Sequence, residues 1–456
     1  MKQKREKPYL TIKKETRDNS FADYSGFQYH SYTIKMQVYK FGGASIATPE
    51  RMKALLPIIE EPGVPIIMVV SALGKVTNAL ERVVETACKG KKEEALQIAK
   101  EIEQEHLDYA RALLSDKIYG EAAKSLNVFF TELQWAIDDA DAGKYDYSYD
   151  QIVCMGELMS TKIFSYLLQE KEMNFEWVDV RDVIRTDDTY RDARVDWVYS
   201  NTQAQQVIAP LLEAGKNVLT QGFIGATADN ASTTLGREGS DYTAAMLAAM
   251  LRAECLTIWK DVEGLQNADP KEFNNTVSIE AITYHEVIEM AYYGAQVIHP
   301  KTIKPLQNNN IPLRVKSFMN SEAKGTVIET EVNSIFYPPL IVLKKNQILL
   351  QVTTKDFSFI TEENLRRLYG IFHDLKVKVN LIQNAAISFV ACIDHREGKV
   401  KELISELEKD YKVLVNGGVS LLTVRHYTPE VLFDLTKSRY ILLEQKTRHT
   451  VQVVLK

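Results

Sequence analysis

The segment KFGGAS, at residues 40–45, lies where the first strand-like run of the chain ends and has the residue types that phosphate chemistry needs. Gly42 and Gly43 leave the backbone free to approach a ligand, so that its amides can surround phosphate oxygens. Lys40 adds a mobile cation that can follow charge developing on a transferred phosphoryl group. The spacing fits neither of the common glycine-rich nucleotide motifs. A plain strand-to-helix turn with a solvated lysine explains the segment equally well.

A second candidate is the polar stretch DNASTTLGREGSD, at residues 229–241, which lies between a strand-like run and a strongly helical one. Long loops without secondary structure inside compact domains are usually functional. Arg237 offers a planar fork for a carboxylate, and Ser240 and Asp241 begin the helix. A cation beside exposed helix-terminal amides predicts an anion site. The alternative is a capped helix after an ordinary linker.

Two further segments could contribute to the same site. Residues 69–78 end a strand and turn into a helix, where small hydroxyl residues could bind a carboxylate at the helix N-terminus. Capping by Thr77 or Asn78 would explain that segment equally well. Glu157, in the sequence GELMS, opens an apolar helix and could hold a substrate ammonium group. The commoner role of such a glutamate is to complement the helix dipole.

The run WKDVEGL, at residues 259–265, follows a strand and could hold the base and ribose of a nucleotide. A turn initiated by the Asp-Pro pair at residues 269–270 is the alternative. His285 and His299 have no partner at metal-ligand spacing, so we interpret both as structural. No metal site built from protein side chains is predicted.

These segments need a scaffold, and the sequence predicts one. Strand-like runs are expected at residues 37–41, 65–71, 175–180, 217–223, 256–260 and 312–316, with amphipathic helical stretches between them. One helix is expected at residues 49–59, where Thr48 can cap and Pro49 suits the first position. This alternation predicts an α/β fold with a mostly parallel sheet covered on both faces. Such sheets bind ligands at the carboxyl ends of their strands.

The composition changes near residues 329–339, and a shorter cycle follows. Its expected strands are residues 347–353, 377–382, 386–393 and 412–415, and its expected helices are residues 362–375 and 399–409. An abbreviated second cycle has a helix at residues 429–437 and strands at residues 420–424, 440–443 and 451–455. We therefore predict a flexible tail at residues 1–35, a large domain at residues 36–328, and two small α+β (ferredoxin-like) modules at residues 340–456.

Bulk composition narrows the class of protein. A length of 456 residues suggests about three domains, and a formal charge of -6 argues against non-specific nucleic-acid binding. The four cysteines form no C-x-x-C pair, which favours a reducing compartment over a disulfide framework. No apolar run is long enough for a membrane span or a secretory signal, so a cytoplasmic protein is expected.

Taken together, the motifs resemble a known family. KFGGAS, VVSALGKVTN, GELMS, TTLGREGSDYTAA, the WKDV–GL–ADP run and GAQVIHPKT occur in the order and approximate spacing seen in aspartate kinases, from about residue 36 to the C-terminus. KFGGAS with TTLGREGSDY is specific to the amino-acid kinase superfamily, and GAQVIHPKT with the paired modules narrows the resemblance to aspartate kinases. The resemblance implies an amino-acid kinase α/β sandwich followed by two ACT-type regulatory modules. It also implies transfer of the γ-phosphoryl group of ATP to the side-chain carboxylate of L-aspartate, with Mg²⁺, as the first step towards lysine, threonine and methionine.

The resemblance also implies a role for each matching residue. Lys40 would stabilise the phosphoryl group in flight, Arg237 would bind the α-carboxylate of aspartate, and Glu157 would pair with its α-ammonium group. Three residues would line the same pocket, namely Thr77, Ser240 and Asp241. The residues expected around ATP are Gly42, Gly43, Ser45, Lys260, Asp261, Gln266, Lys271 and Gln296. Because a carboxylate nucleophile needs no general base, catalysis would consist of in-line positioning and charge neutralisation.

Some positions depart from the family pattern. Many members have threonine, arginine and lysine at the positions of Ala44, Lys271 and Gln296 in this chain. These departures bear on the affinity for ATP and not on the expected reaction. In the first ACT-type module, lysine-inhibited members carry an aspartate and a Ser-Glu pair where this chain has Asn380 and two alanines. Gln383-Asn384 resembles the Gln-Asn element of threonine-responsive members. We therefore expect threonine, or no effector, rather than lysine.

Two other readings remain at this point. The chain could be a sibling kinase that acts on glutamate or N-acetylglutamate, although an acetylated substrate has no positive charge for Glu157. It could instead be a catalytically silent amino-acid sensor, although a sensor has no use for a phosphate-directed Lys40. Because ACT-type modules commonly pair edge to edge, a homodimer or larger homo-oligomer is expected.

Overall fold

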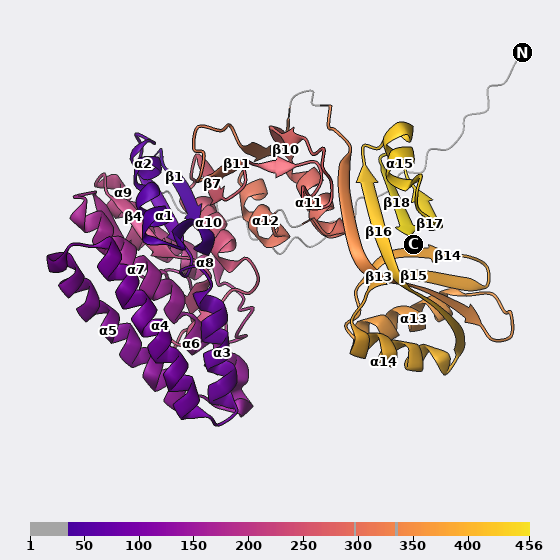
Figure 1. Cartoon of the computed structure of the whole chain (residues 1–456), viewed down its shortest axis with the longest axis horizontal. Coiled ribbons are helices and arrows are strands. Elements are labelled where there is room, and N and C mark those ends of the chain that lie inside the picture. Colours follow the sequence, from indigo (N-terminus) through magenta and orange to yellow (C-terminus); the bar gives the residue numbers. More distant parts are fainter. Residues whose placement is uncertain (1–34, 296–297, 333–335) are drawn as a thin grey trace, which may run out of the picture. The chain divides into compact units, whose positions relative to one another are not determined.

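The computed structural model describes residues 35–295, 298–332 and 336–456 of the chain (Figure 1). The tail predicted at residues 1–35 therefore lies outside the described residues, except for Lys35. Within the described residues, the strands form one sheet of eight, one sheet of six and two small two-stranded sheets.

The eight-stranded sheet carries the candidate segments at its strand ends. Its order is β10-β12-β11-β7-β1-β2-β4-β3, and every neighbouring pair is parallel except β11 and β12. All five residues of β2 are buried, as expected for a strand with both faces covered. The strands are β1 (Gln37–Phe41), β2 (Ile66–Val70), β3 (Phe175–Val178), β4 (Asn217–Gln221), β7 (Cys255–Lys260), β10 (Ala281–Thr283), β11 (Leu313–Ser317) and β12 (Thr326–Glu329).

Helices connect these strands and pack against the sheet in one continuous apolar core. They are α1 (Pro49–Ala54), α2 (Leu56–Glu60), α3 (Val76–Cys88), α4 (Lys92–Leu113), α5 (Asp116–Asp138), α6 (Tyr145–Val153), α7 (Met155–Glu170), α8 (Trp197–Gln203), α9 (Ala209–Glu213), α10 (Gly239–Met250), α11 (Tyr284–Tyr293) and α12 (Pro300–Asn308). In the described part of the chain, none of the helices has the length and apolarity that a bilayer span requires.

The helix predicted at residues 49–59 is interrupted. Thr48 caps α1 as expected, accepting a hydrogen bond from the amide of Arg51 at 3.3 Å. The helical run then breaks at Leu55 and resumes as α2. Pro57 has no amide proton to donate to the preceding turn, which accounts for the break.

The prediction of a structureless loop at residues 229–241 is wrong. A short hairpin of β5 (Ile224–Ala226) and β6 (Ser232–Thr234) occupies its first part, and α10 begins at Gly239. The β-branched threonines of β6 find buried partners: the hydroxyl of Thr233 lies 2.7 Å from that of Thr186, and the hydroxyl of Thr234 donates to Asp150 at 2.7 Å. The rest of the segment consists of residues 229–231, in the turn of the hairpin, and residues 235–238, which connect β6 to α10.

The six-stranded sheet is antiparallel, in the order β14-β15-β13-β16-β18-β17. Its elements are β13 (Leu340–Thr354), α13 (Glu362–Asp374), β14 (Val379–Asn384), β15 (Ser388–Asp394), α14 (Glu397–Glu408), β16 (Tyr411–Arg425), α15 (Pro429–Thr436), β17 (Ile441–Lys446) and β18 (Thr450–Leu455). The separate strands predicted at residues 412–415 and 420–424 are one strand, β16, because it pairs with β13 along nearly its whole length (Figure 1). The remaining two-stranded sheet pairs β8 (Leu265–Gln266) with β9 (Ser278–Ile279).

A buried ion-pair cluster joins the two main sheets through α11. The guanidinium group of Arg425, on β16, donates to both carboxylate oxygens of Glu286 at 2.8 Å and to Glu289 at 2.9 Å. The side chains of Arg425 and Glu286 are each only 9% exposed. Burial alone would raise the pKa of Glu286, but the bonds to Arg425 hold it below its ordinary value.

Candidate active site

The carboxyl ends of four adjacent parallel strands meet at one edge of the eight-stranded sheet. Phe41 of β1 is in register with Val70 of β2 and with Trp259 of β7, and Val70 is in register with Gln221 of β4. The residues that follow these strand ends therefore line a single edge. They are Gly42 and Gly43 after β1, Ser71 and Ala72 after β2, Gly222 after β4, and Lys260 at the end of β7.

Lys40 and Asp241 form the central ion pair of this edge. The ammonium nitrogen of Lys40 lies 2.7 Å from a carboxylate oxygen of Asp241, and the two side chains are 12% and 5% exposed. Lys40 is the penultimate residue of β1, and Asp241 lies in the first turn of α10. The helix thus brings an anion from a distant part of the sequence to orient the lysine.

Close backbone approaches surround this pair. A Cβ atom added to Gly43 would lie 2.8 Å from the carbonyl oxygens of both Ala72 and Gly74, so only glycine fits there. Gly222 meets α10 in the same way, since an added Cβ atom would lie 2.5 Å from that of Ser240. The hydroxyl of Ser71 donates to the hydroxyl of Ser240 at 3.0 Å. These contacts bring the ends of β1, β2 and β4 and the start of α10 close together beside Lys40.

Glu157 is the most unusual charged group at this edge. It lies in the first turn of α7, is 3% exposed, and accepts a hydrogen bond from the amide of Ala72 at 3.3 Å through Oε1. Burial raises its pKa to about 8, although the Ala72 amide and the charge of Lys40 oppose the rise. Among the residues that the structure describes, no hydrogen-bond partner is found for its Oε2. A buried carboxyl oxygen without a partner is available for a hydrogen bond with a ligand.

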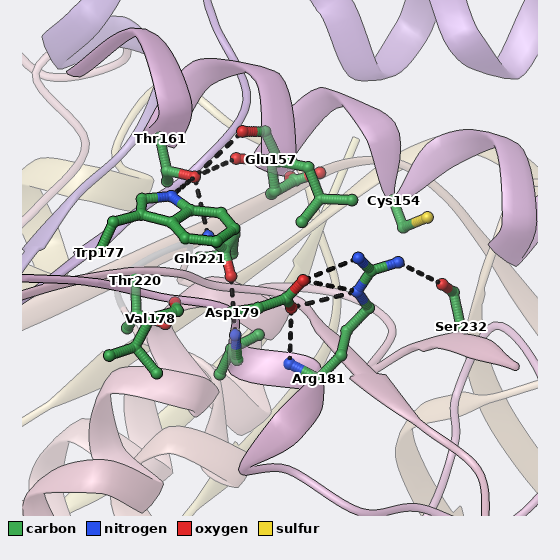
Figure 2. Close-up of polar contacts among 12 residues, drawn as sticks. Cys154, Glu157, Thr161, Trp177, Val178, Asp179, Arg181, Thr220, Gln221 and Ser232 are labelled. Carbon is green, nitrogen blue, oxygen red and sulfur yellow. Dashed lines mark hydrogen bonds and ion pairs between the residues drawn. The ribbon is translucent and has the colours of Figure 1, made fainter. Parts of the chain in front are cut away.

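A buried hydrogen-bond network anchors the helix that carries Glu157 (Figure 2). Thr161, one turn further along α7, donates to the carbonyl oxygen of Glu157 at 2.9 Å. The same hydroxyl accepts from the side chain of Gln221 at 2.9 Å and from the indole of Trp177 at 3.1 Å. Since Gln221 ends β4 and Trp177 lies on β3, these bonds fix the first turn of α7 to the sheet.

A second part of this network holds the β5–β6 hairpin (Figure 2). Arg181 pairs with Asp179 at 2.7 Å and donates to the hydroxyl of Ser232 at 3.2 Å. Because Ser232 begins β6, the Asp179–Arg181 pair connects the end of β3 to the segment that leads towards Arg237.

Arg237 lies in the turn between β6 and α10 and is exposed. Within residues 35–295, 298–332 and 336–456, it makes no side-chain hydrogen bond or ion pair that would fix its guanidinium group. Thr77 is half-buried in the first turn of α3, and neither it nor Asn78 caps that helix, which begins at Val76 after Lys75. The capping explanation for residues 77–78 is therefore wrong.

Four of the residues expected around the nucleotide lie at the end of β7 or in the segment that follows it. Lys260 ends β7, the exposed Asp261 follows it, and Gln266 lies on β8, where its side chain donates to Ser278 at 3.0 Å. Lys271 is exposed in the turn that follows, whereas Ser45 is buried in the short 3-10 helix Gly43–Ile46. The prediction for Gln296 lies outside the described residues. Within the described residues, no cluster of three or more side chains suited to a metal ion is found.

Sequence reasoning singled out neither Gly222 nor Glu238. Gly222 follows a strand as Gly42 does, and that shared position was the available signal. Glu238 precedes Gly239 and has a φ of 55°, a conformation that glycine adopts more readily than glutamate. Its side-chain contact comes from a residue about sixty positions away and leaves no local pattern.

Comparison with known proteins supports the reading of this edge. The model of the amino acid kinase family matches residues 35–317. Lysine-sensitive aspartokinase 3 of Escherichia coli (strain K12) is 32% identical over 398 residues, which cover 85% of this chain and 86% of that protein. The chain belongs to the amino acid kinase family, and within it to the aspartokinases.

Two further similarities are consistent with this membership. The structure of E. coli aspartokinase III in complex with lysine and aspartate aligns with a TM-score of 0.77 and 28% identity, over 92% of this chain and 95% of that one. The bifunctional aspartokinase/homoserine dehydrogenase 2 of Arabidopsis thaliana is 28% identical over 84% of this chain, which spans 42% of the length of that relative.

For this aspartokinase family member, the residues predicted to bind an effector lie on the edge strand β14. Asn380 is half-buried and accepts a hydrogen bond from the ammonium group of Lys344 at 2.8 Å. Its amide donates to Gln347 and to Asp394, both at 2.8 Å. Gln383 and Asn384 are exposed at the end of the strand.

Proposed function

We propose that the chain transfers the γ-phosphoryl group of ATP to the side-chain carboxylate of L-aspartate and forms 4-phospho-L-aspartate. The observation that supports this most directly is the buried Oε2 of Glu157, which has no partner in the described part of the chain and lies at the edge that carries Lys40 and Asp241. Family membership supports the same reaction, and a solved structure of E. coli aspartokinase III contains aspartate and ADP.

In this proposal the two ends of the amino acid are bound by separate charges. Glu157 pairs with the α-ammonium group, and Arg237 binds the α-carboxylate through its planar fork. Ser240 and Thr77 line the space between them. Binding of the ammonium group supplies the missing partner of Glu157, so the carboxylate becomes ionised when substrate enters.

The chemical step then needs little beyond alignment. An oxygen of the aspartate side chain attacks the γ-phosphorus, a new O–P bond forms, the bond to the β-phosphate oxygen breaks, and its electron pair leaves with ADP. No proton moves, because the nucleophile is already an anion. Lys40, oriented by Asp241, neutralises charge on the transferred group.

The nucleotide is proposed to lie beside the end of β1 and along the β7 side of the edge. The amides of Gly42 and Gly43 are proposed to surround its phosphates. The other residues of the proposed set are Ser45, Lys260, Asp261, Gln266, Lys271 and Gln296. Mg²⁺ bound with ATP would offset the negative charge of the phosphates. The buried carboxylate of Asp241 pairs with Lys40, and we place it next to the Mg²⁺ and the phosphates in this proposal.

Regulation by an amino acid is proposed as well, with threonine favoured over lysine. Asn380 is a neutral amide already bonded to Lys344, Gln347 and Asp394, so it offers no carboxylate to pair with the side-chain ammonium group of a lysine effector. A homodimer or larger homo-oligomer, and a cytoplasmic location, stay predictions from the sequence.

The test is an assay that supplies ATP, Mg²⁺ and hydroxylamine, which converts an acyl phosphate to a hydroxamate, with L-aspartate, L-glutamate and N-acetyl-L-glutamate compared. Hydroxamate from aspartate alone is the expected result. Turnover of another substrate would leave the kinase activity in place and show that the phosphoryl acceptor is not aspartate. Binding of amino acids without any turnover would favour a sensor. Titration with lysine and threonine in the same assay tests the effector, and inhibition by sub-millimolar lysine would contradict the proposal.

A further inference from the structure

Glu238 has a backbone conformation that a glutamate rarely adopts. Its φ and ψ of 55° and 30° lie in the left-handed region, directly before the first residue of α10. Non-glycine residues there are uncommon, and a strained backbone persists only where the surrounding structure holds it. Glycine would adopt the same conformation without strain. A compensating contact of the side chain is therefore expected.

The side chain of Glu238 makes such a contact with a distant helix. Its Oε2 accepts a hydrogen bond from the backbone amide of His299 at 2.8 Å. His299 is the N-cap residue of α12, which begins at Pro300. The carboxylate thus lies at the positive end of a helix dipole, where an anion is favoured.

The same turn of α12 also contacts the other end of the Arg237-bearing loop. The ammonium group of Lys301 lies 3.5 Å from the carbonyl oxygen of Leu235 and forms an ion pair with Asp192. Asp192 closes over Gly236, where an added Cβ atom would lie 2.7 Å from its Oδ1. Residues 235–238 are therefore held at their start by Lys301 and at their end by His299.

Arg237 is the residue between these two fixed points, and it has no fixing contact of its own within the described residues. Its direction depends on the backbone of the turn. Backbone hydrogen bonds of Leu235 to Phe223 and of Gly239 to Gly236 restrain that backbone locally. The side chain of Glu238 and the ammonium group of Lys301 add the contacts with α12. A planar guanidinium group binds a carboxylate well only when its direction is set.

We propose that Glu238 is a positioning residue for substrate binding: its bond to the His299 amide holds the turn so that Arg237 faces the α-carboxylate of the amino-acid substrate. The inference rests on the proposed function, because it assigns the ligand of Arg237. It predicts that loss of the bond weakens binding of the amino acid while ATP binding is retained.

Substitution of Glu238 by glycine separates this role from a merely structural one. Glycine removes the bond to His299 but relieves the strained backbone, so the melting temperature of E238G is expected to stay equal or rise. We expect the KM for L-aspartate to rise about tenfold, with kcat and the KM for ATP nearly unchanged, because ground-state and transition-state binding are lost together. E238N, which tolerates positive φ but is too short to reach His299, should behave like E238G. E238Q keeps an acceptor of the same length and should restore most of the affinity.

The donor side gives an independent variant. His299 has a φ of -70°, which proline can adopt, so H299P removes the amide proton with little change of the backbone. H299A loses the imidazole but keeps the amide and is the matched control. The expected result is a raised KM for aspartate in H299P and not in H299A, and no further rise in the double variant E238G/H299P.

The outcomes distinguish this inference from the proposed function. If wild-type protein turns over no aspartate, the proposed function fails first. If it turns over aspartate and E238G has the wild-type KM, the positioning role alone is overturned. Equal rises of the KM for aspartate and for ATP would also overturn it, because that pattern indicates general damage to the site.

Discussion

The parallel sheet and the antiparallel sheet each hold a lysine among buried or half-buried polar groups, and the two lysines have opposite surroundings. Lys344, on β13, donates to Asn380, which in turn bonds to Gln347 and Asp394 across adjacent strands. Lys40, on β1, pairs with Asp241 beside a buried glutamate whose second oxygen has no partner in the described residues. A polar cluster in which every group has a protein partner stabilises the fold. A cluster with an unpartnered buried group gains a further hydrogen bond when a ligand supplies the partner.

The first way to test this contrast is to make the same substitution in both regions. K40M should lower kcat about a thousandfold, because the charge that stabilises the transferred phosphoryl group is lost. K344M should leave kcat within about twofold of wild type and lower the free energy of unfolding by about 1 kcal/mol, the value of one hydrogen bond. Steady-state kinetics and urea unfolding of both variants provide the measurement. A comparable loss of kcat in K344M would remove the distinction between the two lysines.

The second test breaks the connection between the regions. In R425M the Glu286 carboxylate stays buried without its partner, so the free energy of unfolding should fall by about 3 kcal/mol. The four tryptophans all lie within the first 260 residues, so their fluorescence reports the parallel sheet, while circular dichroism reports both sheets. The two urea transitions should separate in R425M. The matched control is R366M, whose pair with Glu363 is exposed and should not contribute measurably to the free energy of unfolding.

The third test concerns the open acceptor. E157Q keeps the shape of the side chain but cannot pair with an ammonium group, so the KM for L-aspartate should rise about a hundredfold while the KM for ATP stays unchanged. E176Q, at an exposed pair with Lys216, serves as the control and should change neither constant. Similar changes in both variants would show that charge in general, rather than Glu157, is responsible.

The fourth test uses pH. Burial raises the pKa of Glu157 from 4.5 to about 8 in the folded protein. Between these two pH values the folded state holds a proton on Glu157 that the unfolded state has lost. The contribution of Glu157 is therefore fully present below about pH 4.5 and is lost as the pH rises through about 8. We expect substrate-free protein to lose about 2 kcal/mol of unfolding free energy between pH 5 and pH 8 beyond the loss in E157Q. Asp150, whose pKa is raised to about 6, contributes in the same direction and is retained in the variant. Identical pH profiles would contradict the assignment.

The sequence determined six of the eight described strands of the larger sheet closely, because each of the six is a short apolar run next to a turn signal, whereas β10 and β12 were not predicted. The predicted runs at residues 37–41 and 65–71, for example, correspond to β1 and β2. It also indicated which residue types lie at the end of β1 and at two helix starts, where local patterns place Lys40, Glu157 and Asp241. The helix break before Pro57 and the hairpin at Ser232 were missed, since a strong amphipathic pattern and a polar composition concealed them.

The tertiary structure alone decided how these groups meet. The ion pair of Lys40 with Asp241 joins residues about two hundred positions apart. The hydrogen bond of Lys344 to Asn380 joins different strands of the antiparallel sheet. Burial of Glu157 depends on how α7 packs against the ends of β3 and β4, so its raised pKa has no local signature. The same holds for Glu238, whose strained backbone is explained only by the amide of His299. Local patterns fix which groups are present, and only packing fixes their distances, their desolvation and which of them are left without a partner.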